Sequence, residues 1–188
     1  MARAPDPNLR LLIAVAQALG ELRERFVFVG GCATGLLITD PAAPAVRPTG
    51  DVDVIVEAGA LLEYRQIGRA LEAKGFSQPL AIRLVTAPYF IATKYEAFIG
   101  RGRGDYLASH DFEDLMAVID GRPELEAELS AASARLRKHI AGVIGRTIAD
   151  DRFRAVVGGF VIEQGGSPDR ASVLMARMRR LAGLADGT

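Results

Sequence analysis

Two aspartates separated by one residue, Asp51 and Asp53, stand at the start of the apolar run Asp51-Val-Asp-Val-Ile-Val56. In an extended strand, residues two apart point to the same side, so the two carboxylates are expected to project side by side. Such a pair can share a hard divalent cation, and Mg²⁺ held in this way bridges to substrate phosphates. The pattern predicts a metal site for phosphoryl or nucleotidyl transfer. In the alternative interpretation, Asp51 only begins the strand and Asp53 faces solvent.

A pair of glycines precedes these acids in the chain. Phe26-Val-Phe-Val29 predicts a short buried strand, and Gly30-Gly31 predicts a tight turn directly after it. Glycines before a helix let the backbone approach a phosphate, and the N–H groups at the helix start attract it. The candidate nucleotide-binding residues are therefore Gly30, Gly31 and Thr49. A Walker A loop is excluded, because no Gly-Lys-Ser/Thr follows the glycines.

The order of apolar strand, Gly-Gly, spacer and Asp-apolar-Asp resembles the nucleotidyltransferase superfamily related to DNA polymerase β. Within that superfamily, the later part of the chain resembles the AbiEii/AbiGii toxin family of type IV toxin–antitoxin systems. The likeness covers about residues 20–125. Its later motifs are a lysine-bearing helix, a basic turn and an Asp-x-x-Asp-Leu helix, which are here Lys94-Tyr-Glu-Ala97, Arg101 with Arg103, and His110-Asp-Phe-Glu-Asp-Leu115.

The resemblance implies a magnesium-dependent transfer of a nucleoside monophosphate from an NTP to an acceptor, either RNA or protein. It further implies the toxin half of a toxin–antitoxin pair, with a cognate antitoxin protein as partner. Carried over by position, Gly30 and Gly31 would hold the triphosphate, and Asp51 and Asp53 would hold the metal. Two further roles follow from the later motifs, phosphate contact for Lys94 and support of the site for Asp111.

The residues themselves leave the last two roles open. Lys94 lies in an otherwise apolar stretch, where a buried amine needs a partner that could be a phosphate or a carboxylate. It could equally extend to solvent. Asp111 and Asp114 are three apart on an expected helix and share a face, but Asp111 is also suited to a first helical turn.

A third carboxylate is the part of the superfamily pattern that this sequence lacks. Members usually carry it on a later strand, yet no acidic residue occurs between Glu72 and Glu96. Three explanations remain: a natural deletion, a third acid supplied by Asp111 or Asp114, or a missing segment near residues 75–82. The last is preferred, because deleting strands would leave sheet edges unpaired. The rival function is a catalytically inactive nucleotide-binding or protein-interaction module of the same fold.

The strands and helices expected around these residues indicate an α+β fold. A nucleotidyltransferase-like core with a small mixed sheet is expected over residues 1–87, followed by an all-helical region over 88–188. Apolar runs predict strands at 26–29, 51–56 and 81–85. Helical periodicity and end signals predict helices at about 8–25, 32–38, 60–74, 89–99, 109–120, 124–137 or further, 151–163 and 168–184.

The composition of the chain excludes several classes of protein. The 188 residues are 49% hydrophobic and 24% charged, which excludes a disordered chain, and no apolar run is long enough for a membrane helix. A soluble, cytoplasmic protein without membrane contact is expected. One cysteine and two histidines exclude a disulfide scaffold and the usual zinc sites. Residues 131–188 hold ten Lys and Arg against five Asp and Glu, which could steer an anionic partner such as RNA or reflect solvated helix faces.

Overall fold

The computed structural model describes residues 5–56, 83–102, 104–163 and 168–183. The fold is mostly helical with one small mixed sheet, so the predicted α+β class is confirmed. The chain forms two compact units, which are described separately. The sheet unit comprises Pro7–Ala33 and Pro48–Val85, and the helical unit comprises Met1–Asp6, Thr34–Arg47 and Thr86–Thr188.

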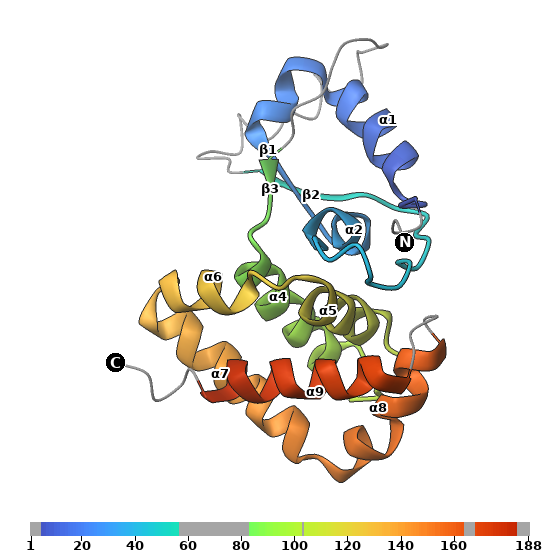
Figure 1. The fold of residues 1–188 in the computed structure, drawn as a ribbon. Helices are drawn as coiled ribbons and strands as arrows, with labels where there is room; N and C mark the ends of the chain where they lie inside the picture. Colours follow the sequence, from blue (N-terminus) through green and yellow to red (C-terminus); the bar gives the residue numbers. More distant parts are fainter. Residues whose placement is uncertain (1–4, 57–82, 103, 164–167, 184–188) are drawn as a thin grey trace. The chain divides into compact units, whose positions relative to one another are not determined.

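The described part of the sheet unit contains three short strands, all at predicted places (Figure 1). The central strand β1 (Phe26–Val29) pairs antiparallel with β2 (Asp53–Val56) and parallel with β3 (Arg83–Leu84). Phe26 and Phe28 point into the core and are fully buried. Strand β2 begins at Asp53, two residues later than predicted, and its register places Asp53 opposite Val29. The last residue of β1 and the first residue of β2 therefore face each other.

The first helix is shorter than its periodicity predicts. Helix α1 (Leu9–Leu19) buries Leu12, Ala16 and Leu19, but it ends at Gly20, whose φ of 55° lies in the left-handed region. A glycine adopts that conformation without steric cost, so it stops an α-helix efficiently. The chain continues to Arg25 as a 3₁₀ helix, η1 (Gly20–Arg25). A second short 3₁₀ turn, η2 (Gly31–Ala33), follows β1.

The helical unit contains one short helix, α2, and the described helices α4 to α9 (Figure 1). Most lie where periodicity places them, but the segment expected as one helix over 124–137 is divided. Ser133 accepts a hydrogen bond from the Leu136 N–H and so caps the start of a new helix. The predicted helix over 60–74 lies outside the described residues. The bounds are α2 Thr34–Leu37, α4 Ala87–Gly100, α5 His110–Gly121, α6 Leu125–Ala131, α7 Ala134–Ala149, α8 Asp151–Glu163 and α9 Pro168–Gly183.

Aromatic side chains form much of the core of this unit. Their rings lie 4.8–6.1 Å apart in tilted and edge-on arrangements, which aromatic pairs favour. They come from α4, α5, α8 and the loop between α4 and α5, and so join segments that are distant in sequence. The cluster consists of Tyr95, Phe98, Tyr106, Phe112 and Phe153.

Residues 34–47 belong to the helical unit, although they were expected to be part of a core domain over residues 1–87. Their contacts explain the difference. The N–H groups of Thr39 and Asp40 donate to the carbonyl of Gly121 at the end of α5, and Ile38, Ala43 and Val46 form a small apolar cluster. Asp40 also accepts a hydrogen bond from Arg170 of α9 at 2.7 Å. Arg170 holds Asp120 of α5 at the same time, so one side chain joins three segments.

Among the helices of the described segments, none combines the length and the low polarity that crossing a bilayer requires.

Candidate functional site

The structure places the predicted site residues in two groups, one in each unit. The first group lies in the sheet unit, where β1 ends opposite the start of β2. Gly30 has a φ of 73°, and a Cβ built on it would collide with the carboxylate of Asp53. The glycine turn and the second aspartate are thus in direct contact. The positive φ and this close approach both require glycine at position 30.

Thr49 positions the other aspartate of the pair. Its hydroxyl donates to Oδ1 of Asp51 at 2.5 Å, and its own N–H donates to Oδ1 of the buried Asn8 at 2.8 Å. Asn8 therefore anchors the loop that carries Thr49, and Thr49 restricts the carboxylate of Asp51. Asp51 and Asp53 are both exposed, so a ligand can reach them from solvent.

Cys32 links the glycine turn to the two acids. Its thiol donates to the carbonyl of Val29 at 3.2 Å and is hydrogen-bonded to the backbone of Asp53. Burial raises the pKa of the thiol, and the negative charges of Asp53 and Asp51 raise this pKa further. Both carboxylates therefore act electrostatically on this buried thiol, although Asp51 lies two residues before β2 begins. Cys32 is a free, buried cysteine.

The carboxylate groups at this end of the sheet are ligands of the type that Mg²⁺ prefers. Mg²⁺ is bound through one or two carboxylates, while its other ligands are waters and substrate phosphates. Asp51 and Asp53 supply two exposed carboxylates beside a glycine turn. In the part of the chain that the structure describes, no third His, Cys, Asp or Glu joins them in a metal-binding group. The preferred explanation for the absent third carboxylate, a missing segment near residues 75–82, concerns a stretch outside the described residues.

Replacing Gly30 by Ala is expected to destabilise the protein by about 1–2 kcal/mol, because an L-residue is strained at positive φ. The new methyl group would also displace the Asp53 carboxylate. Gly50→Ala in the same unit is a matched control, since a Cβ there meets nothing within 4 Å. Urea denaturation measures both changes. Equal midpoints for the two variants would contradict the close contact between Gly30 and Asp53.

The second group, in the helical unit, is a buried ion cluster between α4 and α5. Lys94 is 7% exposed, and its Nζ donates to Asp114 at 2.7 Å and to Asp111 at 3.0 Å. The partner that this buried amine requires is therefore a pair of carboxylates. Asp111 and Asp114 share a helix face, as their spacing predicts. The phosphate contact that the resemblance implies for Lys94 stays a prediction.

Two arginines extend this cluster to the surface. Arg101 makes a two-point contact with Asp111, with Nε 2.6 Å from Oδ2 and Nη2 2.9 Å from Oδ1. Arg47 lies 3.5 Å from Asp114 and 3.2 Å from Glu113. Arg101 comes from the basic turn that the resemblance singles out, and its guanidinium contacts Asp111. Arg103 lies outside the described residues.

The charge balance of the cluster keeps Asp111 ionised. Hydrogen bonds from Arg101 and then Lys94 lower the pKa of Asp111 to about 2, against the opposing effect of burial. Its unfolded value is about 3.9. A carboxyl whose pKa is lowered by folding stabilises the fold above the unfolded pKa, and this stabilisation is lost as the pH falls through the folded pKa.

We therefore expect Arg101→Gln to destabilise the protein by about 1 kcal/mol at neutral pH, a figure reduced for the exposure of the arginine. The difference from wild type should shrink as the pH falls from 4 to 2. Chemical denaturation at a series of pH values measures it. A difference that stays constant over this range would show that Asp111 does not carry the effect.

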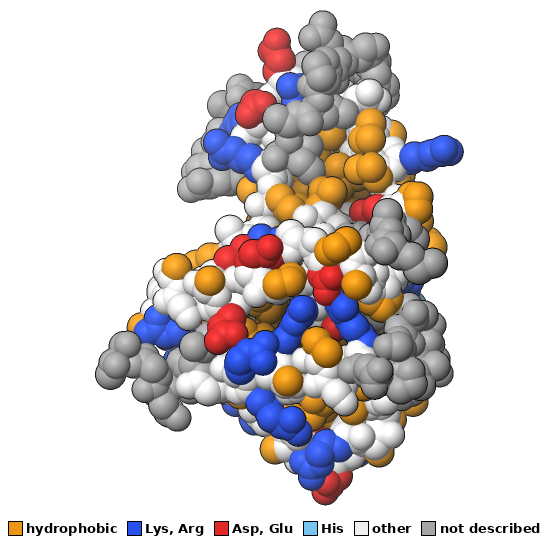
Figure 2. All heavy atoms as spheres, in the orientation of Figure 1, with side chains coloured by type: hydrophobic (Ala, Val, Ile, Leu, Met, Phe, Trp, Pro, Cys, Tyr) orange, Lys and Arg blue, Asp and Glu red, His pale blue; other side chains and the backbone are white. Residues whose placement is uncertain are grey.

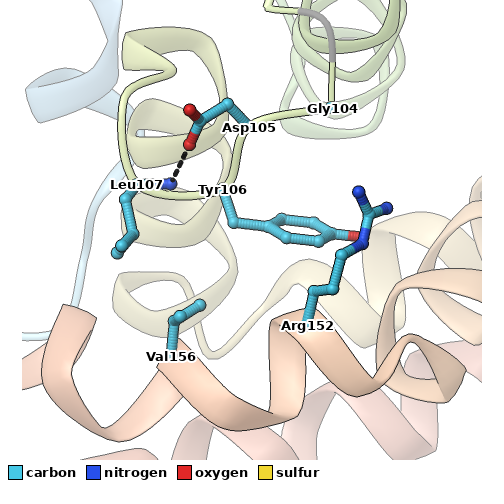
Figure 3. A pocket seen from close by; sticks show the side chains of 6 residues that line it. All are labelled: Gly104, Asp105, Tyr106, Leu107, Arg152 and Val156. Atoms are coloured by element: carbon cyan, nitrogen blue, oxygen red, sulfur yellow. Dashed lines mark hydrogen bonds between the residues drawn. The ribbon is translucent and has the colours of Figure 1, made fainter.

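A pocket of about 320 Å³ lies in the helical unit, and none of the residues that the sequence singled out as catalytic or nucleotide-binding lines it. Figure 3 shows Leu107 and Val156 on one side, the ring of Tyr106 in the centre and Arg152 beside its hydroxyl end. The Tyr106 hydroxyl donates to Asp150 at 2.9 Å. Burial and this acceptor raise the pKa of Tyr106 to about 12, so the phenol stays neutral.

Sequence reasoning did not single out three residues that shape these sites. Asn8 anchors Thr49, Arg47 reaches Asp114, and Tyr106 links the core to the pocket. For Tyr106, the signal was an aromatic residue directly after a glycine-rich turn. Asn8 and Arg47 gave no signal, because their partners are distant in sequence or lie in irregular loops.

No protein-family model, curated protein or solved structure matches the chain.

Proposed function

We propose that this protein is a magnesium-dependent nucleotidyltransferase that moves a nucleoside monophosphate from an NTP to an RNA or protein acceptor. The observation that supports this most is the contact between the Gly30 turn and Asp53, with Asp51 beside it. A phosphate-binding turn and a metal-binding carboxylate pair are useful together only if they serve the same phosphate chain. The proposal includes a nucleotidyltransferase core, a toxin role in a toxin–antitoxin pair and a cognate antitoxin as partner.

In this mechanism, Asp51 and Asp53 would hold Mg²⁺ against the triphosphate. The bound ion would neutralise charge that develops on the phosphates during in-line displacement. Thr49 fixes the orientation of Asp51 through its hydroxyl, which lowers the reorganisation needed on binding. The backbone at Gly30 and Gly31 lacks side chains that would block a phosphate. The acceptor oxygen attacks the α-phosphorus, and pyrophosphate leaves.

The test is incorporation of label from each of the four α-³²P NTPs in the presence of Mg²⁺ and total RNA, with EDTA as control. Both the RNA and the protein fractions are counted, because the acceptor is RNA or protein. Magnesium-dependent incorporation supports the transferase. Binding of an NTP in calorimetry without incorporation into either fraction would replace it with the inactive nucleotide-binding module.

A further inference from the structure

The arginines of the helical unit show a common pattern of pairing. Most described Lys and Arg side chains of this unit lie within 4.0 Å of a carboxylate. Figure 2 shows the resulting mixture of basic and acidic side chains on one face of these helices. The pairs include Arg122 with Glu128, Arg152 with Asp150, Arg154 with Asp151, Arg170 with Asp120 and Arg180 with Glu126.

Helix α7 departs from this pattern. Its sequence, Ala134–Ala149, contains three arginines, one lysine and one histidine and no acidic residue. Arg135, Lys138 and Arg146 are exposed, and within the described residues none of them has a carboxylate within 4.0 Å. Arg137 donates hydrogen bonds through Nη1 to the carbonyls of Ser130 and Ala132 at the end of α6.

The three cations, which have no acidic partner among the described residues, lie on one side of the helix. At 100° per residue, positions 135, 138, 142 and 146 fall within a narrow sector. The cations extend over about 16 Å from Arg135 to Arg146, given 1.5 Å per residue. Gly142 lies between them, with the Arg146 side chain 3.5 Å from where its Cβ would be. His139 is on the same side, and its Nε2 lies 3.5 Å from Oε1 of the exposed Glu96.

Arg135 and Lys138 are three residues apart on α7, and like charges at this spacing repel one another and weaken an isolated helix. An external anion removes this repulsion. The exposed positions of the row carry no large apolar side chain, whereas a helix lying on a membrane needs Leu, Phe or Trp on its inner face. Protein interfaces likewise use aromatic or aliphatic anchors. A row of cations alone fits a regular polyanion whose recognition is electrostatic.

We propose that the exposed face of α7, formed by Arg135, Lys138 and Arg146, binds the phosphodiester backbone of a nucleic acid. The proposal does not depend on nucleotidyl transfer, because it concerns binding by a surface of the helical unit alone. Three contacts to a single strand predict a slope of about −2 in the plot of log K against log salt. Affinity should therefore fall roughly 20-fold between 50 and 200 mM salt.

Fluorescence anisotropy with a labelled 20-nucleotide single-stranded RNA and a duplex DNA of the same length tests this proposal. The triple variant R135Q/K138Q/R146Q should lose affinity at least tenfold at 50 mM salt, with a slope close to zero. The control R152Q/R154Q/R180Q removes the same charge from arginines that are paired with acids, and it should change affinity less than threefold. Glu21→Gln, at an exposed carboxylate of the sheet unit, should bind as the wild type does.

Several outcomes would overturn the proposal. Equal losses in the two triple variants would mean that net charge alone is responsible. Equal binding of poly-glutamate would indicate an acidic protein as the partner. If neither nucleic acid binds at 50 mM salt, the exposed face of α7 is not a nucleic-acid-binding surface. Circular dichroism melting of each variant establishes that these exposed substitutions leave the fold intact, and the two nucleic-acid probes distinguish RNA from DNA as the source of the backbone.

Discussion

Replacing Asp53 by Asn is expected to reduce nucleotidyl transfer by a factor of about 10²–10³, the loss typical when one electrostatic contact to a transition state is removed. Asparagine has the same shape as aspartate, so it should still fit against Gly30. It lacks the negative charge that would hold Mg²⁺. The rate is measured by incorporation of label from an NTP at saturating Mg²⁺, and the stability by urea denaturation.

Glu21→Gln is the matched control for this variant, because Glu21 is an exposed carboxylate of the same unit. It should transfer at the wild-type rate. If Asp53→Asn transfers as fast as Glu21→Gln, Asp53 holds no metal and the proposed transferase is wrong. A loss of transfer that accompanies an equal loss of stability would assign Asp53 a role in folding instead.

Replacing Lys94 by Met is expected to lower the free energy of unfolding by about 3 kcal/mol, because removal of one partner leaves buried charges without compensation. Methionine keeps most of the volume of the lysine stem. The change leaves Asp111 with Arg101 and Asp114 with Arg47 as remaining cationic partners. Urea denaturation at pH 7 measures the difference. The difference should become smaller as the pH falls towards 2, through the lowered pKa of Asp111.

Lys138→Met provides the comparison, because Lys138 is exposed and its removal should change stability by less than about 0.5 kcal/mol. Similar values for the two variants would mean that the buried cluster contributes little to the fold. If Lys94→Met unfolds at the wild-type midpoint but no longer binds an NTP, its amine serves the phosphate contact that the family resemblance implies.

The sheet could be predicted well because its signals are local. Phe26-Val-Phe-Val29 and the run after Asp51 are apolar segments bounded by glycine and acidic residues, and both form strands. The side-by-side placement of Gly30 and Asp53 follows from the pairing of these strands. Helix ends were harder, because Gly20 and Ser133 interrupt patterns whose apolar spacing continues beyond them.

The partners of Lys94 illustrate what one sequence leaves open. An amine in an apolar helix must be compensated, but a phosphate and a carboxylate satisfy it equally. The spacing of Asp111 and Asp114 predicts that they share a face, and only the packing of α4 against α5 brings that face to Lys94. Arg47 approaches the same acids from an irregular loop, where no periodicity exists to guide a prediction.

The membership of residues 34–47 in the helical unit has a consequence for synthesis on the ribosome. Asp40 is made 130 residues before Arg170, the α9 side chain that binds it. At typical elongation rates the interval is on the order of ten seconds. Ile38, Ala43 and Val46 need a shorter wait, because the residues that pack against them, Ala117 and Gly121, belong to α5. The segment can therefore dock on α5 first, and the Arg170 contact from α9 fixes it afterwards.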